Sequence, residues 1–495
     1  MSASNETESA QPQGQAIIQD RIIQRQHTVS IAGQTINYTV STGTFVLKRA
    51  STKSGENAGE FEGDKPKAEF FFIAYTRDDV DIRQRPITFS FNGGPGSSSV
   101  WLHLGVLGPR RVDMVDTEVT KPPYCLLDNN YSLLDQSDLV FIDPVGTGYS
   151  RPVPGEKSTA FHSLKEDIAS VAEFIHLYCS RHGRWASPKF LAGESYGTTR
   201  AAGLAEHLQE RHGMYLNGLM LISSVLDFST LRFASNNDLP HILYLPTFSA
   251  TAWYHQKLSP AWQERPLREL LDEVEAFAIG EYATALMKGS SLSSAEQEQI
   301  AERLAAYTGL SLAYVQHCNL RPEIMRFTKE LLRSERRTVG RLDSRFKAKD
   351  RDSAGMTFEF DPSMAAIMGP YTACFNHYVR EELGYESDFP YEIISMDVNK
   401  GWRWESDNQY VDVAEKLRKS MNLNPHLKVH VANGYFDLAT PHLATEYTFN
   451  HLMLDPGLQD NISMSYYEAG HMMYVHQPSL EALKQELSRF IAEAL

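Results

Sequence analysis

The sequence predicts an α/β protein built on a mostly parallel sheet with helices on both faces. Apolar runs of strand length recur through the first half of the chain, and a segment of helical spacing at 161–179 separates two of them. Such alternation of strands and helices is typical of a parallel sheet. The five strands expected there cover residues 68–75, 86–91, 138–142, 188–192 and 216–222. Two more are expected near the C-terminus, at 427–432 and 462–467.

The chain begins with polar segments that precede the first of these strands. Residues 1–27 are polar and rich in glutamine, which predicts a disordered tail. From 27 to 48, apolar and polar residues alternate on either side of Ala-Gly-Gln at 32–34, so we expect a β-hairpin. Residues 51–67 are rich in Gly, Glu and Lys and are expected to form a polar loop.

The pattern changes after residue 227. Amphipathic helices are expected at 267–286 and 294–307, and no convincing series of strands occurs before residue 400. We therefore expect a core made of residues 28–227 and 386–495, interrupted by a helical lid at 228–385. Inserted lids generally cover an active site and shape its specificity.

A serine between two glycines marks the first candidate site. Residues 193–197 read Gly-Glu-Ser-Tyr-Gly, directly after an expected strand and before a helix expected at 198–210. In this context the sequence forms a sharp turn that exposes the serine hydroxyl at the edge of the sheet. Glycine is needed on both sides because a side chain would collide with the turn. Ser195 is therefore the candidate nucleophile, and a plain Gly/Ser turn is the alternative.

A nucleophilic serine needs a base and a group that orients the base. Asp437 follows the strand expected at 427–432, and His471 follows the strand expected at 462–467. Both positions are carboxyl ends of strands, where catalytic groups of open α/β sheets collect. The order Ser, Asp, His along the chain is the one that accompanies this serine turn. A turn-capping aspartate and a loop-filling histidine are the alternatives.

A glycine-rich loop follows the strand expected at 86–91. Residues 92–99 read Asn-Gly-Gly-Pro-Gly-Ser-Ser-Ser. A loop at this place can supply one backbone N–H to a developing oxyanion, and Tyr196, the residue after the nucleophile, can supply the other. A phosphate-binding loop is excluded because no Lys-Ser/Thr follows at the required spacing. A generic Gly/Pro turn is the alternative.

With these motifs the chain resembles the serine carboxypeptidase family, which has the α/β-hydrolase fold. The resemblance extends from about residue 85 to residue 480. The stretches around 369–373 and 466–474 are most similar to the bacterial branch of the family. The matching motifs lie at 92–96, 107–109, 141–150, 193–197 and 470–472.

The resemblance implies a role for each matched residue. Ser195 would be the nucleophile, His471 its base and Asp437 the orienter of that base. The backbone N–H groups of Gly94 and Tyr196 would form the oxyanion hole. No metal ion or cofactor is implied.

The resemblance also implies a site for the C-terminal carboxylate of a peptide, formed by Asn92 and Glu194. Two carboxyl groups can face each other there only if they share a proton. The chain departs from the family at this point. Ser90 and Ser97 stand where secreted eukaryotic members commonly have Trp and Cys, and Val106 replaces a Glu that often supports the carboxylate site. The carboxylate site is therefore expected to have fewer supporting side chains than in those relatives.

The composition fits a soluble enzyme. The 495 residues are 42% hydrophobic, and the net charge of −15 argues against nucleic acid or an anionic membrane as a partner. No run of 18 apolar residues exists, so no transmembrane helix is expected. The N-terminus lacks the features of a signal peptide, which favours the cytoplasm. The spacing of Cys125, Cys179, Cys318 and Cys374 predicts buried free thiols and no zinc site.

The sequence thus predicts a hydrolase that releases residues from the C-termini of peptides through an acyl-enzyme. An esterase or acyltransferase with the same triad is one alternative. An endopeptidase or aminopeptidase is a second, and a catalytically silent binding protein on the same fold is a third. The sequence gives no indication of the oligomeric state.

Overall fold

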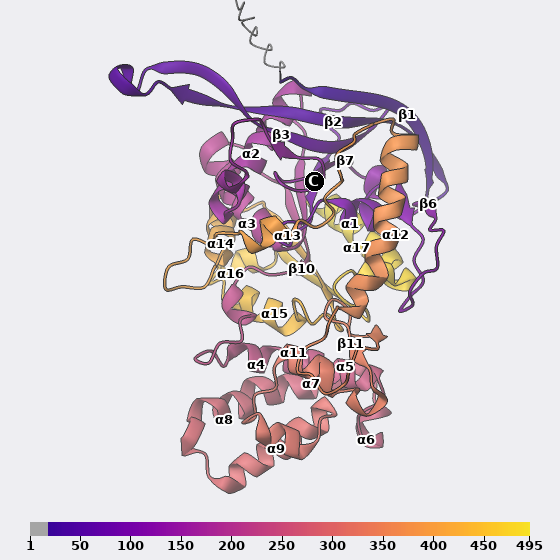
Figure 1. The fold of residues 1–495 in the computed structure, drawn as a ribbon, viewed down its shortest axis with the longest axis vertical. Coiled ribbons are helices and arrows are strands. Elements are labelled where there is room, and N and C mark those ends of the chain that lie inside the picture. Colours follow the sequence, from indigo (N-terminus) through magenta and orange to yellow (C-terminus); the bar gives the residue numbers. More distant parts are fainter. Residues whose placement is uncertain (1–17) are drawn as a thin grey trace, which may run out of the picture.

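The computed structural model of the protein describes residues 18–495, and the main feature of this range is a ten-stranded sheet (Figure 1). Its strand order is β1-β2-β3-β7-β4-β9-β10-β13-β14, with the short β8 paired to β3. The strands are β1 (Arg21–Ile31), β2 (Gln34–Thr52), β3 (Phe61–Arg77), β4 (Ile87–Phe91), β7 (Asp138–Ile142), β8 (Arg151–Pro152), β9 (Lys189–Ser195), β10 (Gly218–Ser224), β13 (Lys428–Gly434) and β14 (Ile462–Tyr467). Two short ladders pair β5 (Arg110–Val112) with β6 (Leu126–Asp128) and β11 (Thr338–Val339) with β12 (Lys347–Ala348).

The sheet is parallel over its larger part. Every neighbouring pair from β7 through β4, β9, β10 and β13 to β14 is parallel, whereas β1, β2, β3 and β7 pair antiparallel. Strands β4, β7 and β10 are buried along their whole length. Their sequences are continuous apolar runs because both faces of a parallel sheet are covered by helices. The predicted α/β class with a mostly parallel sheet is confirmed.

Helices lie on both faces of the sheet. The described helices are α1 (Val100–Leu102), α2 (Leu164–Arg181), α3 (Tyr196–His212), α4 (Leu239–Leu243), α5 (Leu245–Tyr254), α6 (Pro260–Gln263), α7 (Leu267–Phe277), α8 (Ala283–Lys288), α9 (Ser294–Thr308), α10 (Leu312–His317), α11 (Ile324–Glu330), α12 (Pro362–His377), α13 (Met396–Lys400), α14 (Ala414–Leu423), α15 (His442–Asn450), α16 (Pro456–Gln459) and α17 (Gln477–Glu493). One apolar cluster joins the sheet to α2, α3 and α14, and another joins it to α1, α12 and α17.

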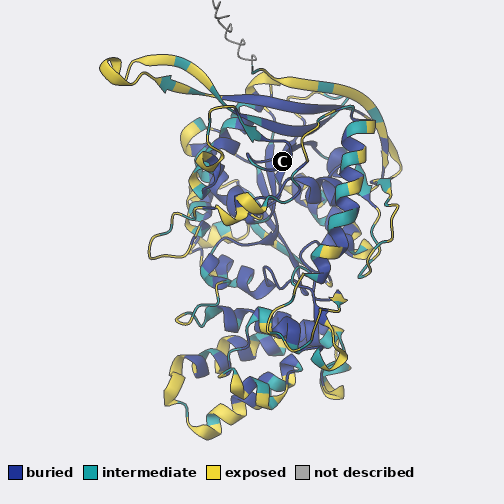
Figure 2. Ribbon diagram, viewed as in Figure 1, coloured by how far each residue is buried: buried dark blue, intermediate teal, exposed yellow. Residues whose placement is uncertain are grey.

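Strand β3 shows how the sequence separates these two clusters. Phe70 and Phe72 belong to the cluster of α2 and α3, whereas Phe71, Ile73 and Tyr75 belong to the cluster of α12 and α17. Successive side chains of a strand point to opposite faces, so one apolar run supplies both layers. The core therefore lies on both sides of the central strands, which are dark blue in Figure 2.

The N-terminal region differs from its prediction. Residues 1–17 of the expected tail lie outside the described residues. Residues 21–27 are wrongly assigned to that tail, because β1 begins at Arg21 and pairs with β2 from Arg21–Thr44 to Ile31–Gln34. The expected hairpin around Ala32 is confirmed. Polar side chains are tolerated in β1 because the long β2 satisfies its backbone groups.

The polar loop expected at 51–67 is correct for residues 53–60 and wrong at both ends, which are strands. Strands β2 and β3 continue past the core as a two-stranded arm, with Lys48 opposite Pro66 and Thr52 opposite Phe61. The arm projects from the molecule at the upper left of Figures 1 and 2, and most of its residues are exposed. Its exposed polar side chains made the sequence look like a loop, although the backbone is paired.

The segment expected to form a lid is largely helical, as predicted. Helices α4 to α11 lie at the lower end of the view in Figure 1 and have an apolar cluster of their own. Helix α9 begins at a capping box of Ser293 and Glu296 and ends at Gly309, which has a left-handed conformation. The expected lid boundary at residue 385 includes α12, which packs on the core instead. Its Tyr371 and Phe375 are buried in the same cluster as Phe71 of β3.

All four cysteines lie in the described range and are unpaired, as expected. Cys179 and Cys374 are buried, as expected, but Cys125 is exposed and Cys318 is only partly buried, so the expectation of burial was wrong for Cys125 and not fully met for Cys318. Among residues 18–495, no helix has the length and apolar character that crossing a bilayer requires. The same range holds no cluster of three or more His, Cys, Asp or Glu side chains suited to a metal ion.

Candidate active site

Ser195 lies at the turn between β9 and α3. Its backbone has φ 60° and ψ −131°, a conformation that non-glycine residues rarely adopt. The two flanking glycines allow this turn to pack against the neighbouring backbone without a steric clash. A Cβ at Gly193 would overlap the backbone of Gly197, and a Cβ at Gly197 would lie 2.8 Å from the carbonyl oxygen of Phe91 in β4. The strand–turn–helix context predicted from the sequence is therefore present, and it presents Ser195 at the edge of the sheet.

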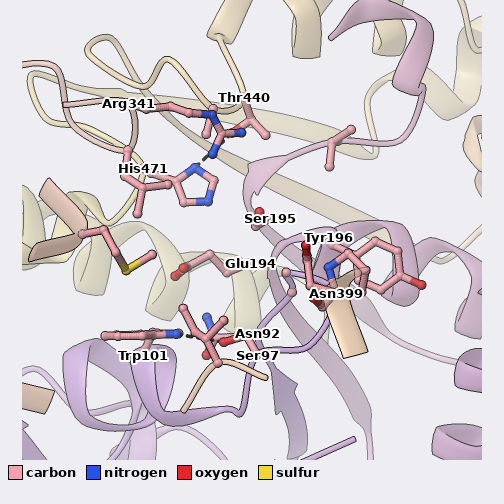
Figure 3. A pocket seen from close by; sticks show the side chains of 18 of the residues that line it. Asn92, Ser97, Trp101, Glu194, Ser195, Tyr196, Arg341, Asn399, Thr440 and His471 are labelled. Atoms are coloured by element: carbon pink, nitrogen blue, oxygen red, sulfur yellow. Dashed lines mark hydrogen bonds between the residues drawn. The ribbon is translucent and has the colours of Figure 1, made fainter. Parts of the chain in front are cut away.

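Asp437 and His471 come together although 34 residues separate them. Asp437 follows β13, His471 follows β14, and these two strands are neighbours. His471 Nδ1 lies 2.7 Å from Asp437 Oδ2. His471 and Ser195 both line the same cavity, and Figure 3 shows the imidazole facing the side on which Ser195 lies.

The carboxylate of Asp437 is fully buried and accepts several hydrogen bonds. Backbone N–H groups of Ala439 and Thr440 donate to Oδ1 at 2.7 and 3.0 Å, and the Thr440 hydroxyl donates to Oδ2 at 2.7 Å. These donors stabilise the ionised carboxylate and fix its orientation. Asp437 can therefore hold the imidazole of His471 in one orientation with its Nδ1 proton facing the carboxylate.

The pKa of His471 reflects two opposing effects. Burial lowers it, but the charge and hydrogen bond of Asp437, together with nearby Glu194, raise the pKa of His471 above its ordinary value overall. An imidazole with a raised pKa is a stronger base when neutral. The arrangement can thus accept a proton from a hydroxyl beside Nε2 and keep the resulting imidazolium stable.

The glycine-rich loop packs directly against the serine turn. A Cβ at Gly93 would overlap the backbone nitrogen of Tyr196, so only glycine allows this contact. Gly94 has φ 103°, in the region that favours glycine. Gly94 and Tyr196 both line the cavity next to Ser195. The loop and the first residue of α3 are therefore adjacent, as an oxyanion hole requires.

Glu194 and Asn92 lie on the same cavity wall (Figure 3). Glu194 is 3% exposed, and this burial raises its pKa to about 7, against the lowering effects of His471, of a hydrogen bond from Tyr474 and of the neighbouring side-chain amide of Asn92. The Oδ1 atom of Asn92 accepts from the N–H of Leu102 at 3.1 Å. Within residues 18–495, the buried Nδ2 of Asn92 has no hydrogen-bond partner. A carboxyl that is easily protonated and an amide that can donate to a ligand therefore lie beside each other on the cavity wall.

A buried ion pair connects Tyr196, at the start of α3, to Asn92, at the end of β4. Arg200 of α3 and Asp167 of α2 pair at 2.8 Å, and both side chains are almost completely buried. Arg200 also donates to the carbonyl oxygen of Asn92 at 2.6 Å, while the hydroxyl of Tyr196 donates to Asp167 at 3.1 Å. The pair therefore fixes the strand end that holds Asn92 relative to the helix start that holds Tyr196.

The cavity has a volume of about 770 Å³. In Figure 3, Ser195 lies between a group formed by Arg341, Thr440 and His471 and a group formed by Asn92, Ser97 and Trp101. Large apolar side chains such as Met364, Ile367, Met368, Ile394, Met396 and Met472 complete the lining. The space is large enough for several residues of a peptide or for another acyl compound of similar size.

Two features of the site were not found from the sequence. Tyr474, whose hydroxyl donates to Glu194 Oε2 at 2.6 Å, lies three residues after His471, within a stretch that was noted only for its resemblance. The carbonyl groups of residues 341–342 accept from the loops of Asp437 and His471, since Leu438 N donates to Arg341 O at 3.1 Å and His471 N donates to Leu342 O at 2.6 Å. No local motif marks residues 341–342, because their role arises from contacts distant in sequence.

The sheet order, the serine turn and the Asp–His pair define an α/β hydrolase. A family model described as serine carboxypeptidase matches residues 52–482. The chain therefore belongs to the serine carboxypeptidase family, as the resemblance of its motifs indicated.

Curated relatives share a shorter region. The pheromone-processing carboxypeptidase kex1 of Aspergillus clavatus is 31% identical over 159 residues, which are 32% of this chain and 24% of that protein. The protein described by the same words from Yarrowia lipolytica is 30% identical over 161 residues, again 32% and 24% of the two chains. The chain thus spans about a quarter of the length of the curated relatives it matches. These relatives are fungal, and the similarity to a bacterial branch stays a prediction.

The similarity to solved structures is weak in both sequence and superposition. An aryl esterase from Burkholderia cenocepacia, described as putative, is 12% identical, with a TM-score of 0.36, and the match covers 95% of this chain and 99% of that one. A monoglyceride lipase variant from Saccharomyces cerevisiae is 9% identical with a TM-score of 0.36, over 91% and 96% of the two chains.

Proposed function

We propose that this protein is a serine carboxypeptidase that releases single residues from peptides with a free C-terminus. The observation that carries the proposal is the placement of Glu194, with a pKa of about 7, beside the side-chain amide of Asn92 on the wall next to Ser195. A protonated Glu194 can donate to a substrate carboxylate, and the amide of Asn92 can donate to its second oxygen. An acyl hydrolase that ignores the C-terminus has no need of this pair.

The proposed reaction begins with Ser195. Its hydroxyl oxygen attacks the carbonyl carbon of the last peptide bond while His471 Nε2 takes the hydroxyl proton. The backbone N–H groups of Gly94 and Tyr196 stabilise the oxyanion, and Asp437 stabilises the imidazolium. His471 then gives the proton to the leaving amino group, the C–N bond breaks, and the terminal amino acid departs. A water molecule attacks the acyl-enzyme by the same route in reverse and frees Ser195.

Binding of the terminal carboxylate would determine which peptide bond of the substrate lies beside Ser195. With that carboxylate held by Asn92 and Glu194, one residue fits between it and the carbonyl that Ser195 attacks. Substrates with more than one residue on the C-terminal side of the scissile bond would be excluded, because an uncharged peptide amide would then be buried against Glu194. The exopeptidase activity therefore depends on two polar side chains, and the triad alone would support esters and amides in general.

The test compares matched peptides with a free or an amidated C-terminus, followed by mass spectrometry. The proposal expects stepwise shortening of the free-acid peptide and at least about 100-fold slower cleavage of its amide, since an unpaired buried polar group costs roughly 3 kcal/mol. Equal cleavage of both peptides would favour an esterase or a general amidase. Internal or N-terminal cuts would indicate an endopeptidase or aminopeptidase.

A second measurement distinguishes a binding protein from an enzyme. A fluorophosphonate probe should label Ser195 covalently, and the site of the label can be located by peptide mapping. A protein that binds peptides without labelling or turnover would support the catalytically silent alternative.

A further inference from the structure

Two arginines of the catalytic cavity have no role in the proposed reaction. Arg232 and Arg341 line the cavity, and among its lining residues Glu194 is the sole carboxylate. Neither guanidinium makes an ion pair or a hydrogen bond with residues 18–495; Arg232 lies over the rings of Phe228 and Trp404, at 5.7 and 5.6 Å from their centroids. Because no acidic side chain of the described residues pairs with them, the two guanidiniums form a positive region in this cavity.

Both arginines lie around Tyr244 of the lid segment. Burial raises the pKa of Tyr244 well above its ordinary value, and the positive charges of Arg341 and Arg232 act against this shift. The Tyr244 hydroxyl donates weakly to the carbonyl of Ala439 in the Asp437 loop, at 3.5 Å. The two guanidiniums therefore act on one patch of the cavity wall, close to the triad loops.

The backbone of Arg341 is held firmly. Its N–H donates to Asp361 Oδ1 at 3.1 Å, and its carbonyl accepts from Leu438 at 3.1 Å. The side chain is half-buried and lies on the His471 side of the site, whereas Asn92 lies on the opposite side of Ser195 (Figure 3). Arg232 is more exposed, so water and salt screen its charge more strongly and weaken its effect.

This placement determines which part of a peptide would meet the arginines. If Asn92 and Glu194 hold the terminal carboxylate, the chain on the N-terminal side of the scissile bond continues away from them, toward Arg341. The argument therefore rests on the proposed function. A carboxylate in that part of the substrate can accept two parallel N–H donors from the planar guanidinium, whereas an ammonium group would meet two like charges.

We propose that Arg341, assisted by Arg232, forms a subsite for an acidic side chain at the penultimate position of the substrate. The preferred substrates are peptides with Glu or Asp directly before the C-terminal residue that is released. Arg341 makes the direct contact, and Arg232 adds attraction at the cavity mouth.

The test uses three peptides that differ solely in a penultimate Glu, Gln or Lys, each with a free and an amidated C-terminus. In the wild-type enzyme kcat/KM should be about tenfold higher for Glu than for Gln, the size of a partly solvated charge-assisted contact, and lower again for Lys. The preference for Glu should shrink as the salt concentration rises.

Variants then test which arginine causes the preference for a penultimate Glu. Arg341→Gln should bring the Glu/Gln ratio of kcat/KM close to one, and Arg341→Lys should keep part of it because the charge remains. Arg232→Gln should lower the ratio by a smaller factor. The matched control is Arg351→Gln, which removes an exposed lid arginine that does not line the cavity, and it should keep the wild-type ratio.

The outcomes separate this inference from the function on which it rests. Cleavage of free-acid peptides with equal rates for Glu and Gln overturns the subsite and leaves the carboxypeptidase intact. If Arg341→Gln abolishes the difference between free-acid and amidated peptides, Arg341 binds the terminal carboxylate and the subsite assignment is wrong. If no free-acid peptide is cleaved while activated esters are, the proposed function itself fails.

Discussion

The hydroxyl of Tyr474 donates a 2.6 Å hydrogen bond to Oε2 of Glu194, and the two residues are 280 positions apart in the chain. Both side chains are buried, and the Tyr474 ring lies against Gly105, where any side chain would overlap it. The family position that often holds a supporting Glu is Val106 here, which is buried in the core. The supporting contact to Glu194 thus comes from the segment after His471, and it connects the proposed carboxylate site to the proposed base.

Replacing Tyr474 by Phe should raise the pKa of Glu194. The hydroxyl donates to the ionised carboxylate and lowers its pKa, so its loss favours the protonated form. The rise of KM at alkaline pH should therefore move upward by about one pH unit, the equivalent of one hydrogen bond to a charged group. The measurement is KM against pH for a free-acid peptide. Tyr371→Phe removes a nearby hydroxyl that makes no hydrogen bond to Glu194 within residues 18–495, and its profile should stay close to wild type; an unshifted profile for Tyr474→Phe contradicts the prediction.

Peptide cleavage should weaken as pH rises through about 7. The folded-state pKa of Glu194 is raised, so its proton is present below about 7 and lost above it, and the substrate carboxylate then meets a like charge. KM for a free-acid peptide should rise by up to tenfold per pH unit above that point. An amidated peptide should show only the acid-side loss caused by protonation of His471, whose pKa is raised.

The same experiment with Glu194→Gln should flatten the alkaline rise of KM, because the glutamine amide stays neutral at every pH. Wild-type profiles that coincide for the two substrates would remove Glu194 and Asn92 from carboxylate binding.

Ser195→Ala should lower kcat by roughly 10⁴-fold or more and abolish labelling by a fluorophosphonate, since the oxyanion hole and binding alone retain a small part of the catalysis. The variant should remain folded, because alanine removes one partly buried hydroxyl that makes no hydrogen bond to residues 18–495. Thermal unfolding checks this point. Acyl-enzyme formation at the wild-type rate in the variant would show that another residue is the nucleophile.

His471→Ala should lower kcat nearly as much as Ser195→Ala, and Asp437→Asn somewhat less, because members of a triad act as a unit. An amide at position 437 would place an NH₂ group against the donors from Ala439 and Thr440 or against His471. His476→Asn is the matched control. His476 lies near His471 in sequence but bonds to Ser479 at 2.8 Å and does not line the cavity. If the control loses activity and His471→Ala does not, the base is misassigned.

Arg200→Met should destabilise the protein by about 3 kcal/mol, because it leaves Asp167 buried without its partner. The variant should also raise KM, since Arg200 holds the carbonyl of Asn92. Chemical denaturation measures the first effect and peptide kinetics the second. Arg418→Met, which removes the surface pair with Glu415, should leave the free energy of unfolding nearly unchanged because solvent screens that pair. Similar losses for both variants would count against the role of the buried pair.

Local sequence was sufficient for the central parallel strands and for the loops that carry the candidate triad. Continuous apolar runs predicted β4, β7, β9 and β10, because buried parallel strands have few other residue choices. The positions of Asp437 and His471 followed from the strands before them, since the carboxyl ends of neighbouring parallel strands share one edge. The glycines around Ser195 predicted the turn because a tight turn excludes side chains at those positions.

The tertiary structure decided the features that depend on distant partners. The first residues of β1, 21–26, and the arm of β2 and β3 are strands because a neighbouring backbone pairs with them, and their polar sequences do not reveal this pairing. Helix α12 joins the core and not the lid because of the aromatic side chains that it meets there. The contact of Tyr474 with Glu194 and the position of Arg341 beside His471 arise in the same way. Sequence sets local geometry and burial, whereas the choice of partner across hundreds of residues is made by the packing of the whole chain.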